Sequence, residues 1–568
     1  MAAQPNMFSF NLSFNDIVGI IPTSKTPTKH VSFRNSNKSK TISNIREFNT
    51  STGLITFEEL EQNFINCKHY YSVSLLALDN NIFGVNKYWD DKKDNITVHA
   101  INSYTIYHKN LYNVLIKFLT EKQQRGADVE KTVYTGITDN KKFIERLLTN
   151  RPLAFYGKSD SYTLRDNTSS GNVNNFDFKK LIEDNNTQPQ PQLQDYISYD
   201  EMELSAFLGC SVETYFINDG NKLNMGKIVG NTQAGTDDYV ESGYYIGIVG
   251  PRFEREGLMD WKYIIVTPEQ NIQENGYIDK LVIPAIQATP AIQATPVIQA
   301  TPATPATLVP ANGKLLCHSM YGDSCLYTYK SLLLQDLNNE KLYIKYKEND
   351  GAEDKYFNID AYKKRLQCVF EPFFLDANKR GTHDKKTYCH VVGLGLGAWV
   401  ILKIETEQIQ LYVDALLETL VNLYTKTPNI NYVDLSWINT QRNSKNKEIN
   451  KFTEFQQTMV EALKKIGITV FHSYNNPFSY KKVIVLGNSA FNMDNNTLVA
   501  MYAWDSNAYA GNEYYDDYLN WSGDPAAACC STISFLQNPI INPHILESTS
   551  YAAGFHYTTV VPLIKETI

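Results

Sequence analysis

A proline-rich repeat divides the chain and limits how it can fold. Residues 283–310 read IPAIQATPAIQATPVIQATPATPATLVP, in which three near-copies of the hexamer AIQATP are followed by shorter echoes. Proline lacks a backbone N–H and fixes its own φ angle, so regularly spaced prolines forbid a helix and keep their neighbours extended. The repeat therefore predicts a semi-rigid Pro/Thr/Ala linker at 283–311, with a ligand role for its Thr-Pro segments as the alternative.

The segments on either side of this repeat are each long enough to form a domain. A chain of 568 residues exceeds what one hydrophobic core usually supports. We therefore expect a separate N-terminal α+β domain at 53–282 and a second domain at 312–568. A flexible segment is expected at 1–52, because residues 24–52 are rich in Ser, Thr, Asn and Lys.

The composition argues against several classes of partner. The formal net charge is −8 and the isoelectric point is about 5.8, so the overall composition does not supply the basic residues expected for nucleic-acid binding. The 8 cysteines show no CxxC spacing and the 10 histidines form no HExxH motif, so no metal site is predicted. Without an export signal or an apolar run of about 18 residues, we expect a soluble protein without a membrane segment. A reducing cytoplasm is the expected compartment. The alternative is secretion into a host cytosol by a signal that these rules do not detect.

The segment after the repeat alternates strand-like and helical patterns. Five apolar runs read as strands: 389–402, 432–438, 468–472, 482–486 and 498–504. Two runs at helical spacing read as helices: 409–424 and 452–466. This alternation is typical of an α/β fold with a mixed sheet flanked by helices, in which ligands bind at the carboxyl ends of strands.

The segment before the repeat gives a weaker pattern. Short strands are expected at 153–156, 214–218, 244–249 and 263–267. Helices are expected at 141–148 and near 199–208. These elements favour a mixed α+β domain.

A polar stretch follows the last apolar run and contains the motifs AWDSNAYAGNEYY and SGDPAAACCSTI. A simple connection needs few carboxylates, yet Asp505 and Glu513 lie here together with the carboxamides of Asn507 and Asn512. Two carboxylates and two carboxamides suit the binding of ribose hydroxyls and the positioning of a water for glycosidic cleavage. Asp524 has a second reading, because Asp followed by Pro is a standard helix start.

A glycine-rich turn, GLGLG, follows an earlier apolar run and contains Gly393, Gly395 and Gly397. Exposed backbone amides of such a turn can bind a diphosphate without a lysine. The alternative is that these glycines only let the backbone approach a neighbouring layer, since the third glycine of the dinucleotide fingerprint is missing. If the turn binds a ligand, it and the polar stretch are expected to converge on one cleft.

Several of these motifs resemble a known family. HVVGLGLGAWV, VDLSWI and the two motifs of the polar stretch are similar to the macrodomain-like catalytic region of Legionella effector proteins that resemble poly(ADP-ribose) glycohydrolase. The resemblance covers about residues 312–560 and implies an ADP-ribose-binding α/β fold that removes ADP-ribose from modified proteins, with arginine-linked ADP-ribose on ubiquitin as one substrate class. It also implies that Asp505, Glu513 and Asp524 carry the catalysis. The GGG-rich catalytic loop of the classical glycohydrolases is absent.

The first segment carries a second resemblance. FYGKSDSYTL, LSAFLGCSVETYFINDGNKLNMG and YYIGIVGPRFEREGLMDWKYIIVTPEQN resemble an uncharacterised domain family of Legionella and other microbes, remotely similar to ADP-ribosyltransferases. This resemblance implies an NAD site. Its residues would be Tyr156, Ser211, Thr214, Glu269 and, for the diphosphate, Arg252 or Arg255. The alternative is a turn, a core strand and surface charges.

Together these observations predict an ADP-ribosylhydrolase that needs no redox cofactor and takes ADP-ribose as its ligand. Asp505 or Glu513 would orient or deprotonate the attacking water, and Asn507 and Asn512 would bind ribose hydroxyls. The expected partner is an ADP-ribosylated protein. Two alternatives stay open: a bifunctional protein whose first segment transfers ADP-ribose from NAD, and a non-enzymatic module that only binds ADP-ribose.

Overall fold

The computed structural model describes most of the chain between residues 55 and 547. The described residues are 55–67, 77–156, 161–166, 168–169, 192–229, 239–253, 255–278, 313–334, 342–397, 399–438, 452–479, 483–485, 489–491, 495–504, 507–509, 512 and 530–547. The N-terminal segment 1–52 and the repeat at 283–311 lie outside them. The roles predicted for these two segments therefore stay predictions.

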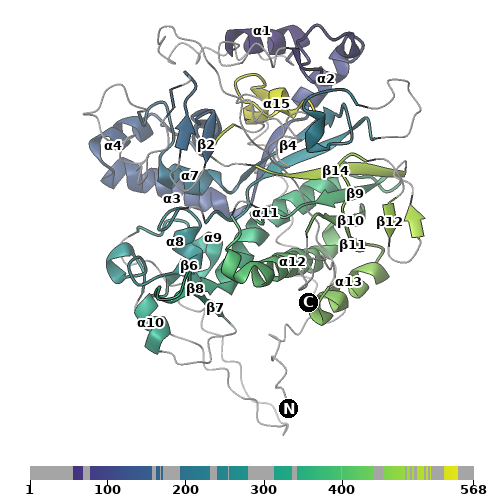
Figure 1. Cartoon of the computed structure of the whole chain (residues 1–568). Helices are drawn as coiled ribbons and strands as arrows, with labels where there is room; N and C mark the ends of the chain where they lie inside the picture. Colours follow the sequence, from purple (N-terminus) through teal and green to yellow (C-terminus); the bar gives the residue numbers. More distant parts are fainter. Residues whose placement is uncertain are drawn as a thin grey trace, which may run out of the picture.

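A seven-stranded mixed sheet forms the centre of the molecule (Figure 1), with the strand order β1-β4-β5-β14-β9-β10-β11. The bounds of its strands are Tyr104–Tyr107 (β1), Leu208–Tyr215 (β4), Ser242–Ile248 (β5), Asn496–Ala503 (β14), Lys386–Val391 (β9), Ile430–Ser436 (β10) and Thr469–Ser473 (β11). The strands from β5 to β11 run parallel, whereas β4 is antiparallel to both β5 and β1. The parallel strands therefore end along one side of the sheet, which we call the carboxyl edge.

Helices cover both faces of this sheet, which confirms the expected α/β arrangement. One face carries α11 (Ile359–Arg380), α12 (Glu405–Asn422) and α13 (Glu454–Lys465). The other side carries α1 (Phe57–Cys67), α2 (Lys93–Ile101), α15 (Ile533–Leu536) and α16 (His544–Glu547). Figure 1 shows α1, α2 and α15 above the sheet and α11, α12 and α13 below it. Because the central strands are covered on both faces, β9 and β14 are buried along nearly their whole length.

Local sequence signals explain where the flanking helices begin and end. The side chain of Thr453 accepts a hydrogen bond from the backbone N–H of Gln456 at 3.2 Å, and Gln456 Oε1 accepts one from the backbone N–H of Thr453 at 3.0 Å. This capping box starts α13. The helix ends before Gly467, whose φ of +92° is the left-handed conformation typical of a residue after a helix.

The longest helix, α11, is buried in the middle of the molecule. Its start is capped by Asn358, whose side chain accepts from the backbone N–H of Ala361 at 3.0 Å. Phe370, Phe373 and other apolar side chains are buried around most of its circumference. Helix α11 therefore packs against the central sheet on one side and against other helices on the opposite side.

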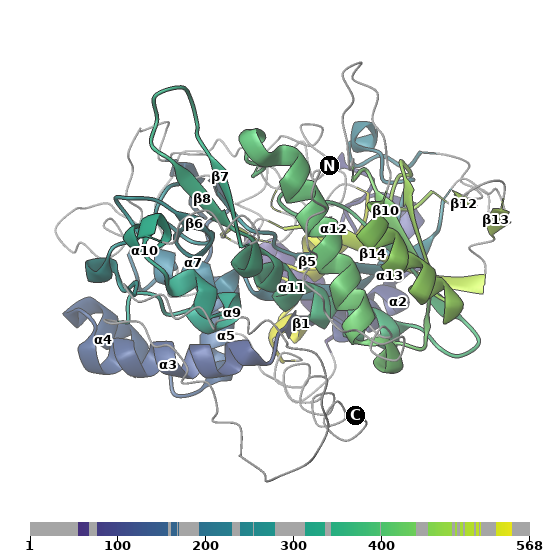
Figure 2. The same ribbon diagram turned by 90° about the horizontal axis from the view of Figure 1, so that it is seen from below.

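A second group of elements lies beside the sheet, on the left in Figure 2, which views the molecule from below. Its helices are α3 (Asn110–Arg125), α4 (Asp128–Thr135), α5 (Asn140–Thr149), α7 (Tyr199–Ser205), α8 (Trp261–Ile264), α9 (His318–Tyr321) and α10 (Tyr329–Leu334). Its strands form a pair, β2 (Ala154–Tyr156) with β3 (Ser161–Thr163), and a sheet of β6 (Ile265–Val266), β8 (Lys355–Asn358) and β7 (Tyr343–Tyr346). A separate pair, β12 (Val483–Val485) with β13 (Ser489–Phe491), lies away from this group, on the right in Figure 2.

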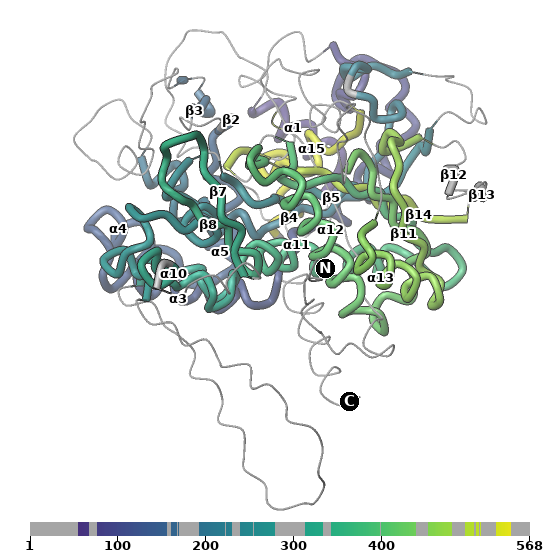
Figure 3. The backbone as a smooth tube through the Cα atoms, turned by 60° about the horizontal axis from the view of Figure 1, so that its bottom comes forward, coloured from purple at the N-terminus to yellow at the C-terminus, as the bar shows by residue number. Residues whose placement is uncertain are grey.

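The seven-stranded sheet and the sheet of β6, β8 and β7 each combine strands from before and after the repeat. This differs from the expectation of a separate domain at 53–282. Strand β5 pairs in parallel with β14 over Tyr244–Ile248 and Val499–Ala503, and β6 pairs with β8. Figure 3 shows β4 and β5, in teal, running beside the yellow-green β14. Strand pairing between distant segments is tolerated because the entropic cost of closing a loop grows only slowly with its length. The division into 53–282 and 312–568 therefore does not separate two folded units.

No helix within the described part of the chain combines the length and the apolar character that a membrane span requires.

Candidate functional site at the carboxyl edge

Three loops meet at the carboxyl edge because β5, β14 and β9 are neighbouring parallel strands. The loop after β5 contains Gly250 and Arg252, the loop after β14 contains Asn507, and the glycine turn at 393–397 follows β9. Ligands of α/β folds bind at such an edge, outside the carboxyl ends of the strands. The fold thus brings together residues that are up to 257 positions apart, namely Gly250 and Asn507.

The glycine turn packs directly against the loop after β5. A β-carbon built on Gly250 would lie 2.6 Å from the carbonyl carbon of Leu394, and one on Gly395 would lie 2.8 Å from the carbonyl oxygen of Pro251. Gly395 also has a φ of +71°, which favours glycine. These two glycines therefore permit close backbone contact, as in the alternative considered above.

The outer part of the turn is more open. Gly393 is partly exposed, and Gly397 is exposed, with no atom within 4 Å of a built β-carbon. The turn therefore has an inner, packed side at Gly395 and an outer side where a ligand can reach the backbone.

Arg252 is buried beside the glycine turn. Its side chain is 1% exposed, and its guanidinium carbon lies 5.1 Å from the ring centre of Trp399 and 5.9 Å from that of Phe155. Its Nη1 lies 3.7 Å from Sδ of Met259, and Nδ2 of Asn507 lies 3.6 Å from the same sulfur. Met259 therefore connects the arginine to the loop after β14.

A buried ion pair holds the loop after β5 in place. Nε of Arg365, on α11, lies 2.7 Å from Oδ1 of Asp260, and its Nη2 donates to the carbonyl oxygen of Val249 at 3.1 Å. The second carboxylate oxygen of Asp260 accepts from the backbone N–H of Arg252 at 2.9 Å. The hydroxyl of Tyr321 donates to Oδ1 of Asp260 at 2.7 Å. These charge-assisted hydrogen bonds fix the backbone on which Arg252 sits.

The loop after β14 is anchored by a second buried arginine. The guanidinium carbon of Arg151 lies 4.2 Å from the ring centre of Trp504, and its Nη1 donates to the carbonyl oxygen of Ala508 at 3.2 Å. Nε1 of Trp504 donates to the same carbonyl at 3.1 Å. Tyr509 extends the anchor, because its hydroxyl donates to the carbonyl oxygen of Thr149 at 2.6 Å.

Both predicted ribose-binding carboxamides are buried in this loop, since Asn507 and Asn512 are 0% exposed. The backbone N–H of Asn512 donates to the carbonyl oxygen of Tyr509 at 3.1 Å. Within the part of the chain that the structure describes, neither Oδ1 nor Nδ2 of Asn512 has a hydrogen-bond partner. A buried carboxamide in this state is costly unless another polar group pairs with it, as a ligand hydroxyl would do.

The predicted catalytic carboxylates lie outside the described residues: Asp505, Glu513 and Asp524. Their assignment stays a prediction, but the chain on both sides of them is anchored. Trp504 is anchored directly before Asp505, and Tyr509 is anchored before Glu513 and Asp524. After them, the carbonyl oxygen of Cys530 accepts from the backbone N–H of Ile217 at 2.9 Å, and Oγ1 of Thr532 lies 2.7 Å from Oγ1 of Thr214. The segment that carries the three carboxylates therefore starts and ends on the central sheet.

The residues predicted for an NAD site are distributed over the molecule. Ser211 and Thr214 lie three positions apart on β4, so their side chains face opposite sides of the sheet. Ser211 donates to Asp376 of α11 at 2.6 Å, whereas Thr214 contacts Thr532, at the end of the polar stretch. Tyr156 is the last residue of β2, Glu269 is exposed, and Arg252 lies at the carboxyl edge. The structure thus places Arg252 with the glycine turn rather than with Ser211.

Arg255, the other arginine considered for the diphosphate, contacts a different tyrosine. Its Nη1 donates to the hydroxyl of Tyr199 at 2.9 Å, and its guanidinium carbon lies 5.7 Å from the centre of that ring.

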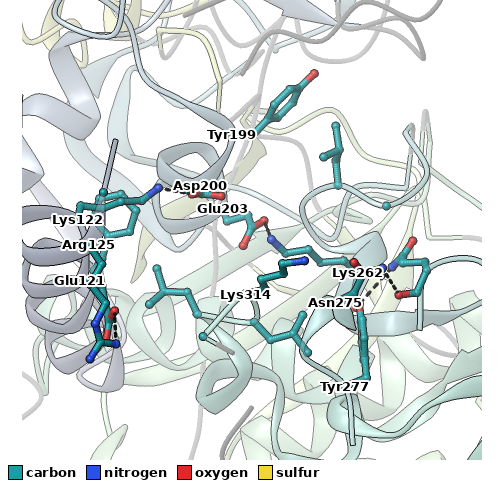
Figure 4. Close-up of a pocket in the computed structure, with 18 of the residues that line it drawn as sticks. Glu121, Lys122, Arg125, Tyr199, Asp200, Glu203, Lys262, Asn275, Tyr277 and Lys314 are labelled. Atoms are coloured by element: carbon teal, nitrogen blue, oxygen red, sulfur yellow. Dashed lines mark hydrogen bonds and ion pairs between the residues drawn. The ribbon is translucent and has the colours of Figure 1, made fainter. Parts of the chain in front are cut away.

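A cavity of about 880 Å³ lies among α3, α4, α7 and the segments around 256–277 and 313–316 (Figure 4). Figure 4 shows Lys262 directed toward Glu203 and Lys122 toward Asp200, and the second pair is separated by 2.8 Å. Burial raises the pKa of Glu203 to about 7. Among the described residues, the lining includes Glu269 but none of the glycines of the turn. The carboxylates and amines of this cavity therefore pair mainly with one another.

Metal-binding groups are not gathered in the described structure. Within the described ranges, no three His, Cys, Asp or Glu side chains lie close enough together to hold a metal ion.

A largely parallel sheet defines an α/β protein, and its carboxyl edge, with a glycine turn, a buried arginine and a carboxamide-rich loop, is the candidate ligand site. A family model described as ADP-ribosylhydrolase MavL-like matches residues 75–564. The chain belongs to this family and is an ADP-ribosylhydrolase. The match covers the strands on both sides of the repeat, in agreement with the shared sheet.

Two Drosophila melanogaster proteins are similar over most of their length. The chain is 28% identical to ADP-ribosylarginine hydrolase CG3568 over 473 residues, which cover 83% of this chain and 81% of that protein. It is 26% identical to ADP-ribosylarginine hydrolase CG2909 over 448 residues, which cover 79% of this chain and 78% of that protein. The predicted hydrolase function is thereby confirmed.

Proposed function

We propose that this hydrolase cleaves the bond between ADP-ribose and an arginine side chain of a modified protein, at the carboxyl edge of the sheet. The observation that carries the proposal is the meeting of the glycine turn, Arg252 and Asn507 at that edge. The arginine linkage is supported by the names of the two Drosophila relatives. A macrodomain-like arrangement is supported by the parallel strands that end at one polar edge.

The chemistry of the three loops supports the following position of the ligand. The diphosphate lies on the outer amides of the glycine turn, near Gly397, and the positive charge of Arg252 lies beneath it. The distal ribose lies over the loop after β14, where Asn507 and Asn512 bind its hydroxyls. Asn512 supports this placement because its carboxamide is buried without a partner in the described structure. ADP-ribose supplies the hydroxyls that such a carboxamide needs.

The reaction is a hydrolysis without a change of oxidation state. Asp505 or Glu513 takes a proton from a water molecule, and the water oxygen forms a bond to C1 of the distal ribose. The bond between this carbon and the arginine nitrogen breaks, and the electron pair stays on that nitrogen, which is protonated as it leaves. The products are ADP-ribose and an unmodified arginine. No redox cofactor takes part.

The test is release of ADP-ribose from an arginine-modified protein by the full-length chain. Asp505→Asn and Glu513→Gln should each lower turnover, the more important one by ~10²-fold or more, because acid–base assistance contributes about that much. Asp517→Asn, in the same acidic stretch, is the matched control and should retain turnover. Turnover unchanged in both Asp505→Asn and Glu513→Gln at equal thermal stability would remove these carboxylates from the mechanism.

The same assay addresses the linkage and the remaining alternatives. Serine-linked and glutamate-linked ADP-ribose should be released more slowly than arginine-linked ADP-ribose. ADP-ribose binding without release from any modified protein would show a binding module instead of an arginine hydrolase. Incorporation of label from NAD into protein by the Asp505→Asn variant would support the bifunctional alternative.

A further inference from the structure

Two aromatic side chains are exposed where β10 and β11 reach the carboxyl edge. Trp437 follows β10 and is 57% exposed, and Tyr474 follows β11 and is 43% exposed. Their ring centres lie 5.3 Å apart with an angle of 79° between the ring planes. Because β10 is the strand next to β9, this aromatic pair lies beside the glycine turn along the same edge.

Trp437 is held in a backbone conformation that tryptophan rarely adopts. Its φ is +59°, in the left-handed region, which is an outlier for a bulky side chain. Its backbone N–H donates to the carbonyl oxygen of Ser473 at 3.0 Å, and its Nε1 donates to the carbonyl oxygen of Asn475 at 3.1 Å. Strained residues of this kind cluster at binding sites, where the surroundings fix them in advance of the ligand.

A buried polar network supports the two hydrogen bonds that Trp437 donates to Ser473 and Asn475. Oδ2 of Asp434, in the middle of β10, accepts from the hydroxyl of Tyr388 at 2.6 Å and from the hydroxyl of Ser473 at 2.8 Å. The backbone N–H of Asn475 donates to Oγ of Ser473 at 3.1 Å, and the carbonyl oxygen of Asn475 accepts from Ser436 at 2.8 Å. The network therefore fixes the carbonyl that orients the Trp437 ring.

The strand order predicts which part of the ligand reaches this aromatic pair. Neighbouring strands lie ~4.8 Å apart, so β10 and β11 lie ~5 and ~10 Å from β9 along the edge. With the distal ribose at β14 and the diphosphate at β9, the adenosine half of ADP-ribose extends toward β10 and β11. An adenine ring is flat and stacks on exposed aromatic rings whatever its hydrogen-bonding pattern.

We propose that Trp437, supported by Tyr474, stacks on the adenine of ADP-ribose and sets the preference of the site for the adenosine half of its substrate. This inference rests on the proposed function, which places the diphosphate at the glycine turn. Trp437 is a binding residue in this proposal. Asp434 and Asn475 are positioning residues that act through it.

The test measures binding of free ADP-ribose and of ribose 5-phosphate to the full-length chain by calorimetry. Trp437→Gly is the decisive variant, because glycine adopts the left-handed conformation without strain but has no ring. It should keep the thermal stability of the parent chain and weaken ADP-ribose by ~10-fold or more, since stacking on an aromatic ring has about that effect. Trp437→Phe should retain most of the affinity. Binding of ribose 5-phosphate, which lacks adenosine, should not change.

Indole fluorescence gives a readout that a merely structural role would not produce. ADP-ribose should quench the fluorescence of the parent chain, and Trp437→Phe should remove that part of the quench. Leu402→Ala, at an apolar residue that is 79% exposed, is the control and should leave both affinity and quench unchanged.

Other outcomes would overturn the proposal. Equal affinity of the parent chain and of Trp437→Gly for ADP-ribose would contradict it. If the KM of that variant for the modified protein were then higher, the aromatic pair would be a contact for the acceptor protein instead. Equal weakening of both ligands would make Trp437 a structural residue. A parent chain that releases ADP-ribose from modified arginine without any Trp437 quench would reject the adenine contact while retaining the proposed function.

Discussion

Individual glycines at the carboxyl edge differ in what they permit. Gly250 and Gly395 stand where two loop backbones touch, and a β-carbon on either would lie within 2.8 Å of a backbone atom of the other loop. Gly397 belongs to the same sequence motif but has open space around it. The motif GLGLG therefore contains positions with separate roles, one in packing and one at the exposed surface.

We expect Gly395→Ala to lower stability and ADP-ribose affinity, whereas Gly397→Ala should retain stability. The first change combines a clash with Pro251 and a φ of +71°, and conformations of this kind cost ~1–3 kcal/mol for a residue with a side chain. Thermal unfolding and calorimetry with ADP-ribose measure the two effects. Similar melting temperatures for the two variants would show that the loop after β5 moves away easily.

A second prediction concerns Asp434 and the pH dependence of the stability of the chain. Burial raises the pKa of its carboxyl to about 6 in the folded chain, against about 3.9 for an unfolded Asp. Because the folded-state pKa is the higher one, the protonated carboxyl contributes stability below pH ~4 that is lost as the pH rises through about 6.

The side chain of the Asp434→Asn variant cannot ionise, so the variant should not lose stability in this way as the pH rises. Between pH 4 and 7, the unfolding free energy of the parent chain should therefore fall by ~2 kcal/mol relative to that of the variant, which is most of the stabilisation that the pKa difference supplies. Urea unfolding of both proteins at several pH values measures the difference, and titrations common to both cancel. A difference that stays constant across this range would contradict the assignment.

The sequence pointed to some site residues and not to others. Gly393 and Asn507 stood out because glycine-rich and carboxamide-rich stretches follow apolar runs. Arg252 was also selected, but for another site. Met259 and Arg151 gave no local signal, because their roles depend on contacts with Asn507 and Ala508 that only the folded sheet creates.

Elements with a one-sided pattern could be predicted, and elements buried all round could not. The helices expected at 409–424 and 452–466 correspond to α12 and α13, whose apolar residues repeat at helical spacing. Helix α11 was missed because apolar side chains cover most of its circumference and because Pro372, a residue that disfavours helix interiors, lies inside it. The helix expected near 199–208 corresponds to α7. Strand β4 begins at Leu208, well before the strand expected at 214–218, since its burial on both faces removes the alternating pattern.

The junction of α11 with the loop after β5 gives a prediction at the scale of elements. Arg365→Met should lower stability by ~3–5 kcal/mol, because it leaves the carboxylate of Asp260 buried without its charged partner. The control is Lys364→Met, one residue earlier on the same helix. Its exposed pair with Asp360 contributes only ~0–1 kcal/mol.

Denaturant unfolding of the two variants compares these costs directly. Because Arg365 also donates to the carbonyl oxygen of Val249, the loss should extend to ADP-ribose binding at the carboxyl edge. Equal stability of the two variants would mean that water replaces the guanidinium of Arg365 without cost.

Over the whole molecule, the repeat at 283–311 suggested a boundary that the sheets do not respect. A pattern of prolines shows where regular structure is excluded, but not where the chain goes afterwards. Pairing of β5 with β14, and of β6 with β8, joins segments that are more than 80 residues apart, from Ile265 to Phe357 in the nearer case. Such pairing leaves no local signal, so the shared core could not be predicted from one sequence.

Cutting the chain within the repeat should therefore leave one folded particle. A specific protease site placed among the AIQATP hexamers tests this. After cleavage, the fragments ending and beginning at the repeat should elute together in size-exclusion chromatography, unfold in one thermal transition and retain release of ADP-ribose. The reason is that separation would expose the paired edges of β5 and β14 and divide a hydrophobic core that contains Ile246 and Met501.

By the same argument, residues 312–568 produced alone should fail to bind ADP-ribose. Two separately folded fragments, with ADP-ribose binding confined to the second, would restore the boundary at the repeat and contradict the shared sheet.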